Sequence, residues 1–107
     1  MKPSERRKAR HFAVQAIYQW QMTQDNVADI EEQFKLEQPM KGVDIGYFGE
    51  LLLGVASHAN KLDTTFSPFL SRKLEDLDMV DKAILRLSTF ELLYRKDVPY
   101  RVVINEA

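Results

Sequence analysis

The chain has 107 residues, of which 45% are hydrophobic and 29% charged, and its formal net charge is −1. This length and composition predict one globular domain, exclude a disordered chain and argue against two unrelated activities. Cysteine is absent, which excludes disulfides, thiolate metal sites and a cysteine nucleophile. Because the sequence has neither an apolar run long enough to span a bilayer nor the pattern of a secretory signal, we expect a cytoplasmic protein without membrane contacts.

Apolar side chains spaced by three and four residues recur along the chain, whereas the period-two alternation of strands is absent, so the pattern predicts an all-α fold. The first helix is expected to run from Ser4, a good N-cap placed just after Pro3, to about Met22. One side of this helix carries an apolar stripe that should face the core, made of Ala9, Phe12, Ala13, Ala16, Ile17 and Trp20.

The same helix begins with a cluster of cations. The first ten residues hold five basic side chains and one acidic one, a net charge of +4, and the other residues hold ten basic and fifteen acidic ones, a net charge of −5. The helical period places a basic ridge beside the apolar stripe, made of Arg6, Arg7, Arg10 and His11 with Tyr18 at its end. A basic cluster here opposes the helix dipole, and two interpretations stay open: a solvated surface, or a site for the phosphates of RNA or DNA.

Two further helices should follow. Asp25 or Asn26 is predicted to cap the second helix, which should be short and end before Pro39. The third should begin near Asp44 and bury a wide apolar face made of Phe48, Leu51, Leu52, Val55, Ala59 and Leu62. We expect close approach of a neighbouring helix to account for the glycines within it, Gly46, Gly49 and Gly54.

The helix with the clearest pattern comes after Ser67, Pro68 and a short connecting segment. It is predicted to run from Asp78, its N-cap, to about Lys96. Its apolar side consists of Val80, Ala83, Ile84, Leu87, Phe90, Leu93 and Tyr94. Pro99 stands where another helix should begin, and the sequence supplies only the first turns of that helix.

Residues typical of catalysis are few. His11 and His58 are the only histidines and lack metal-site spacing, and motifs for phosphate loops and nucleophile elbows are absent. The acids at positions 75, 76, 78 and 81 fit helix capping, and Glu91 with Arg95 fits a structural i, i+4 ion pair. We therefore expect no enzymatic activity, no metal site and no cofactor.

Three segments carry a family resemblance, namely RRKARHFAVQAIYQWQ (6–21), YFGELLLGVASHANKLD (47–63) and LEDLDMVDKAILRLSTFELLYRKDVPYRVVINEA (74–107). Together and in this order they resemble the NusB family of bacterial transcription antitermination factors, and they cover nearly the whole chain. The stretch from ILRL through DVPY to INEA is the most diagnostic part. The resemblance implies a single domain, 1–107, built from an N-terminal helical subdomain (1–66) and part of a C-terminal one (67–107), so that the second small bundle is incomplete.

The resemblance also implies a function without chemistry. NusB-like proteins pair with NusE, a ribosomal protein of the small subunit, and bind the boxA element of single-stranded nascent RNA. This complex joins the RNA polymerase antitermination complex and supports transcription of ribosomal RNA operons. The family's arginine-rich start corresponds to Arg6, Arg7 and Arg10, with Lys2 just ahead, and Tyr100 is a further candidate for RNA contact.

The protein-facing surface of the family corresponds to Tyr18, Glu75 and Asp81, which the resemblance places against NusE. Glutamate is the family's expected residue at position 81, so the aspartate shortens the reach of that contact.

Two other functions stay open. One is the NusB-like domain of a ribosomal RNA cytosine methyltransferase, which needs a downstream cofactor-binding domain with a catalytic cysteine. The other is a purely protein-binding helical module.

Members of the family continue past INEA into a final helix, so this chain resembles a C-terminally truncated copy. We therefore expect several apolar side chains of the later helices to be partly uncovered, among them Leu77, Ile84, Leu87, Phe90, Tyr94 and Val103. Apolar patches of this kind are usually covered by association, which predicts a homo-oligomer or an exchange of helices between copies.

Overall fold

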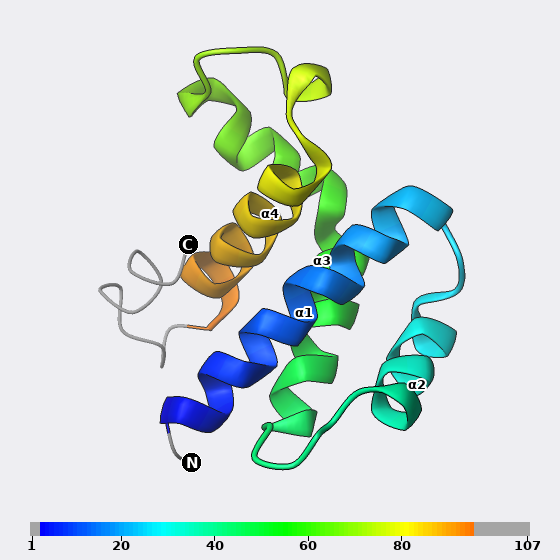
Figure 1. Ribbon diagram of the computed structural model, residues 1–107. Helices are drawn as coiled ribbons and strands as arrows, with labels where there is room; N and C mark the ends of the chain where they lie inside the picture. The colour runs from blue at the N-terminus through cyan, green and yellow to red at the C-terminus, as the bar shows by residue number, and fades with distance from the viewer. Residues whose placement is uncertain (1–2, 96–107) are drawn as a thin grey trace.

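The computed structural model describes residues 3–95, which fold into a bundle of helices (Figure 1). In chain order these are α1 (Pro3–Thr23), α2 (Val27–Glu37), α3 (Ile45–Phe66), the short 3-10 turns η1 (Ser67–Phe69) and η2 (Leu74–Asp76), and α4 (Met79–Tyr94). No strand occurs between residues 3 and 95, and the all-α prediction is confirmed. None of the helices in this range is long and apolar enough to cross a membrane. The helix expected after Pro99 lies outside the described residues.

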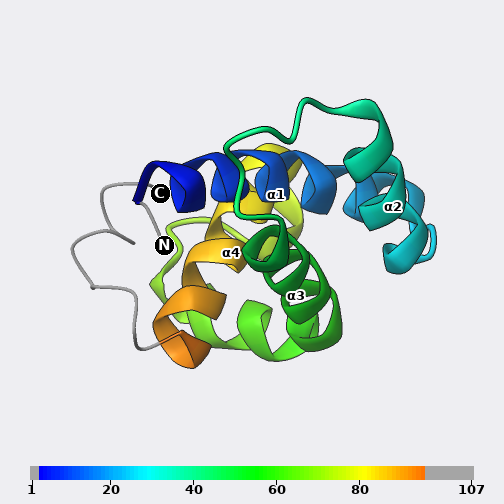
Figure 2. The same cartoon turned by 90° about the horizontal axis from the view of Figure 1, so that it is seen from below.

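The helices α1, α3 and α4 pack against one another, and α2 lies against α1 and α3. Seen from below, α1 forms one layer, and α3 and α4 lie side by side beneath it (Figure 2). The helix α3 bends at His58, where φ is −117° and ψ is 16°. Nδ1 of His58 lies at hydrogen-bond distance, 2.8 Å, from the Gly54 carbonyl oxygen, and the His58 ring packs against Tyr94 at an interplanar angle of 38° with ring centres 4.7 Å apart.

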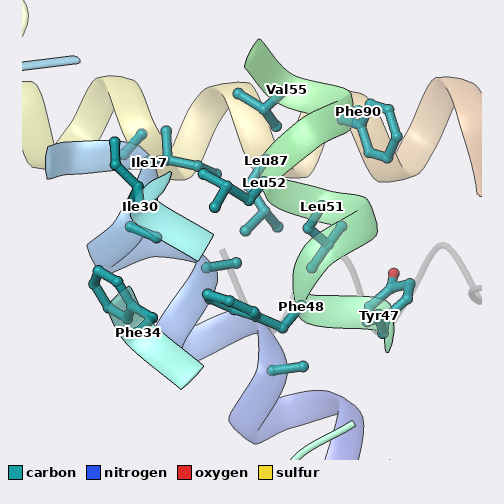
Figure 3. Close-up of a cluster of buried hydrophobic side chains, with 14 of the residues drawn as sticks. Ile17, Ile30, Phe34, Tyr47, Phe48, Leu51, Leu52, Val55, Leu87 and Phe90 are labelled. Carbon is teal, nitrogen blue, oxygen red and sulfur yellow. The ribbon is translucent and has the colours of Figure 1, made fainter. Parts of the chain in front are cut away.

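Buried side chains from all four helices form one hydrophobic cluster (Figure 3). The stripe predicted for α1 is confirmed, with four fully buried residues and two that pack partly buried against the cluster: Ala9, Ala13, Ala16 and Ile17, then Phe12 and Trp20. The small alanines allow neighbouring helices to approach α1 closely. Because α4 adds Ala83, Leu87 and Phe90 to the same cluster, it shares its core with the first three helices. The subdomain division at residue 66 stays a prediction.

Side-chain caps fix the starts of three helices as predicted. Side-chain oxygens of Asn26, Asp44 and Asp78 accept hydrogen bonds from the backbone amides of Ala28, Tyr47 and Val80 at 2.8, 3.1 and 2.7 Å. The N-cap expected at Ser4 is wrong, because α1 already begins at Pro3. Proline has the helical φ built in and loses no hydrogen bond in a first turn, so it starts the helix readily.

The glycines of α3 confirm the expected close approach at two of three positions. A Cβ atom at Gly54 would overlap the ring of Phe90 from α4, and one at Gly49 would overlap the carboxylate of Glu31 from α2. At Gly46 the nearest atom is Oδ1 of Asp44, at an ordinary 3.7 Å. The prediction is therefore wrong for Gly46, where a Cβ atom would meet no tight contact.

The expected exposure of the later helices is confirmed only in part. Tyr94 is 37% exposed, and Leu77 and Ile84 are half-buried. Leu87 and Phe90 are buried, at 4% and 5% exposure, so the prediction is wrong for both. Both belong to the buried cluster, and the Phe90 ring packs against Gly54 of α3. Val103 lies outside the described residues, and association between copies stays a prediction.

The contact between Gly54 and Phe90 predicts that Gly54→Ala destabilises the fold. The new methyl group must displace a buried ring, and overpacking of this kind costs about 1–3 kcal/mol of unfolding free energy. Gly46→Ala is the matched control, because it adds the same methyl group to the same helix with only an ordinary contact to Asp44 and gains up to about 1 kcal/mol of helix propensity. Urea unfolding measures both. Equal stability of the two variants would show that Phe90 moves aside at no cost.

Candidate RNA and protein interfaces

The basic ridge is only partly exposed. Arg7 and Lys8 are exposed, and so is His11 one turn later. Arg6 keeps 25% of its side chain exposed; its Nε lies 3.9 Å from Oδ2 of Asp44, and its guanidinium carbon lies 4.6 Å from the centre of the Tyr47 ring. Contacts with α3 therefore hold Arg6 in place beside the exposed Arg7.

Arg10 does not join this exposed surface, and the prediction that it lies on the solvated ridge is wrong. Only 6% of Arg10 is exposed, and its Nε donates to both carboxylate oxygens of Glu91 in α4, at 2.9 and 3.1 Å. The helical period explains this position. Residues seven apart lie on nearly the same face of a helix, and Arg10 is seven positions before the fully buried Ile17.

Tyr47 of α3 completes this buried cluster and is a residue that the sequence interpretation missed. Its hydroxyl donates a hydrogen bond to Oε2 of Glu91, and the ring is 4% exposed at one edge of the core (Figure 3). Burial and the neighbouring Glu91 carboxylate raise the pKa of Tyr47 well above its usual range, so the hydroxyl keeps its proton and remains a donor at neutral pH. In sequence, Tyr47 is one more aromatic residue at the start of an apolar helix, and nothing there indicates this role.

The structural role predicted for Glu91 is confirmed, because its carboxylate accepts hydrogen bonds from Arg10 of α1 and Tyr47 of α3. Arg95 forms an ion pair with Glu50 of α3, and its guanidinium carbon lies 4.8 Å from the centre of the Tyr47 ring. Glu91 is 1% exposed, and a carboxylate so deeply buried requires ionic or hydrogen-bonding partners.

The predicted partner-facing residues lie near the other end of α1. Tyr18 is 39% exposed and lines a depression that Val80, in the first turn of α4, also lines. Asp81 follows Val80 and is exposed, so the fold brings Tyr18 and the start of α4 to one surface. Glu75 is exposed on η2, outside the lining of this depression.

Polar contacts hold α1 and α4 together beside that surface. The Gln21 side-chain amide donates to the Met79 carbonyl oxygen at 2.8 Å, and its own oxygen accepts from Nη1 of Arg86 at 3.1 Å. The Arg86 guanidinium also forms two parallel hydrogen bonds with Asp63 of α3, at 2.8 and 2.7 Å. The geometry around Tyr18 and Asp81 is thus fixed by contacts among three helices.

Two of the predicted RNA contacts, Lys2 and Tyr100, lie outside the described residues. Within residues 3–95, no group of three or more His, Asp or Glu side chains is arranged to hold a metal ion. The fold and its two charged surfaces define a small all-α protein of the helical-bundle class.

Comparison with known proteins identifies the family. The NusB family profile matches residues 7–107. Relatives named transcription antitermination protein NusB are 73% identical in Aeromonas salmonicida, 71% in Tolumonas auensis and 60% in Shewanella halifaxensis. Each match covers all of this chain and 78–79% of the relative. The chain belongs to the NusB family. These names describe a transcription factor and not an enzyme, which confirms the prediction of a non-enzymatic protein.

The buried ion pair predicts a large loss of stability when one partner is removed. Arg10→Ala or Glu91→Ala leaves an uncompensated buried charge, which lowers the unfolding free energy by about 3–5 kcal/mol. Arg7→Ala, the matched change at an exposed arginine, should alter it by less than about 0.5 kcal/mol.

The double variant Arg10→Met with Glu91→Leu separates charge from packing. Because neither charge is then left buried, it should lose much less stability than the sum of the two alanine variants. Chemical unfolding of the full set measures these differences. Losses in the double variant that equal that sum would contradict a coupled pair.

Proposed function

We propose that this protein is a transcription antitermination factor that binds boxA-type single-stranded RNA together with the ribosomal protein NusE. In this proposal it acts in the cytoplasm, within the RNA polymerase antitermination complex on ribosomal RNA operons. Membership of the NusB family and the names of the relatives support the antitermination role. The observation that carries the RNA part is the exposed Arg7 beside the partly exposed Arg6 at the start of α1.

The chemistry of this helix end suits a phosphate backbone. The first turn of a helix presents free amide groups and the positive end of the dipole. Arginines placed there add to that positive potential, and each guanidinium can hold a phosphate through two parallel hydrogen bonds. Lys2 and Tyr100 remain in the proposal as further RNA contacts.

Arg10 enters the proposal in a different role from Arg6 and Arg7. Its guanidinium is held by Glu91 in the interior, so it is a positioning residue that fixes the rotation of α1. With that rotation fixed, Arg7 lies at an exposed position of the helix. RNA then meets a helix end whose orientation is set before binding, which reduces the entropy lost on association.

The surface around Tyr18, Glu75 and Asp81 is proposed to bind NusE. An exposed aromatic ring beside an apolar depression can supply a binding anchor, and the exposed carboxylates of Asp81 on α4 and Glu75 on η2 complement the charge of a basic ribosomal protein. This surface is formed by the second half of α1, the start of α4 and η2, whereas the proposed RNA surface is formed by the first turns of α1. RNA and protein can therefore bind together.

The RNA proposal predicts that Arg7→Glu lowers the affinity for boxA RNA at least about tenfold and reduces the salt slope by about 1, because a phosphate contact is lost. Arg72→Glu, a reversal at an exposed arginine between η1 and η2, is the control. Binding titrations at several salt concentrations, with boxA and scrambled RNA, measure both effects. If Arg7→Glu binds boxA RNA like Arg72→Glu, α1 is not the RNA surface. A purely protein-binding module would show no salt-dependent RNA binding in any variant.

The partner proposal predicts that Tyr18→Ala and Asp81→Lys each weaken the NusE complex about tenfold or more without unfolding the chain. Glu32→Lys is the control, since Glu32 is exposed and lies on α2 opposite the buried Ile30 and Phe34. Calorimetry with purified NusE measures affinity, and circular dichroism checks helix content. Affinities matching that of Glu32→Lys would place the partner surface elsewhere.

A further inference from the structure

A groove beside α1 contains two lysines that belong neither to the basic ridge nor to the residues that the family resemblance assigns to RNA. It has a volume of about 520 Å³ and is lined by Arg7, Lys8, His11, Phe12, Pro39 and Lys41. The first four residues belong to α1, and the last two to the segment that connects α2 with α3. We call it the basic groove.

The lining of the basic groove combines charge with apolar surface. Three of its residues are cations, Arg7, Lys8 and Lys41, and none is acidic. Phe12 and Pro39 supply apolar surface, and the exposed imidazole of His11 packs edge-on to the Phe12 ring, with centres 6.1 Å apart. Cations beside aromatic and apolar faces are what a nucleotide of a single strand requires, since its phosphate needs charge and its base needs a flat surface.

The segment that carries Lys41 is held against α1. The Asp44 amide donates to the carbonyl oxygen of Glu5 in α1 at 3.1 Å, and the Val43 amide donates to the Met40 carbonyl oxygen at 3.1 Å. Gly42 adopts a φ of +77°, and a Cβ atom there would lie only 3.2 Å from Nζ of Lys8. The left-handed turn and the close approach of Lys8 both favour glycine, and together they bring Lys8 and Lys41 to the same groove.

We propose that the basic groove binds one nucleotide of the single-stranded RNA and extends the RNA path from Arg7 across α1 to the turn at Lys41. Lys8 and Lys41 hold phosphates, and His11 and Phe12 face the base. The inference rests on the proposed function. It adds a second element to the RNA surface, because the turn before α3 takes part as well as α1.

The test is RNA binding by Lys41→Ala, with Lys73→Ala as the matched control at an exposed lysine away from the groove. Loss of one phosphate contact should weaken binding of boxA RNA about three- to tenfold and reduce the salt slope for a single strand by about 0.7. Lys41→Arg keeps the charge and should retain the parent's salt slope. Lys41 is exposed, so thermal melting of all three variants should match that of the parent.

His11→Ala tests the base-facing side of the groove separately. At pH 8 it should lower RNA affinity up to about tenfold through lost stacking while leaving the salt slope unchanged. Both results, from Lys41→Ala and His11→Ala, are needed to support a nucleotide site.

The remaining outcomes overturn the inference in distinguishable ways. If Arg7→Glu loses RNA binding but Lys41→Ala behaves like Lys73→Ala, the RNA path does not enter the groove, and the proposed function stands. If Lys41→Ala instead weakens the NusE complex and leaves RNA binding intact, the groove is a protein contact. If the parent protein binds no RNA, with or without NusE, the proposed function fails and the inference fails with it.

Discussion

The arrangement of the helices depends on the ion pair between Arg10 and Glu91, completed by the hydroxyl of Tyr47. These residues come from α1, α4 and α3, and they are 6%, 1% and 4% exposed. Apolar contacts such as those of the alanine stripe are not directional, whereas a buried carboxylate must find its donors in a defined geometry. The ion pair therefore selects one rotation of α1 against α3 and α4, and that rotation decides which cations of α1 reach solvent.

A second polar contact, near the other end of α1, makes this arrangement rigid. Arg86 joins Asp63 of α3 and Gln21 of α1, so the same three helices are linked by polar groups at two places with the apolar core between them. Each proposed surface lies beside one of these links: the basic end of α1 beside the Tyr47 cluster, and Tyr18 beside the Gln21 contacts. Binding residues attached to such a scaffold keep their relative positions without a ligand.

The features that could be predicted from the sequence are those that depend on residues close together in the chain. The caps at Asn26, Asp44 and Asp78 and the stripe of α1 follow from local hydrogen bonding and helical period, and the structure confirms them. The prediction that the helical period places Arg10 on the ridge with Arg6 and Arg7 is wrong, because its spacing of seven residues from Ile17 puts it on the buried face. The role of Tyr47 and the role proposed for Lys41 arise only when distant segments meet, and no local pattern encodes which helix a side chain will face.

Arg10 and Glu91 are 81 positions apart in the chain, which sets the order of events during synthesis. The guanidinium leaves the ribosome long before the carboxylate that neutralises it, and until then water must solvate it. The first three helices can collapse early through apolar contacts that are close in sequence. The face of α1 that carries Arg10 cannot be buried, however, until the carboxylate of Glu91 is present to neutralise the guanidinium. Native packing of the nascent chain is therefore completed only after α4 has emerged.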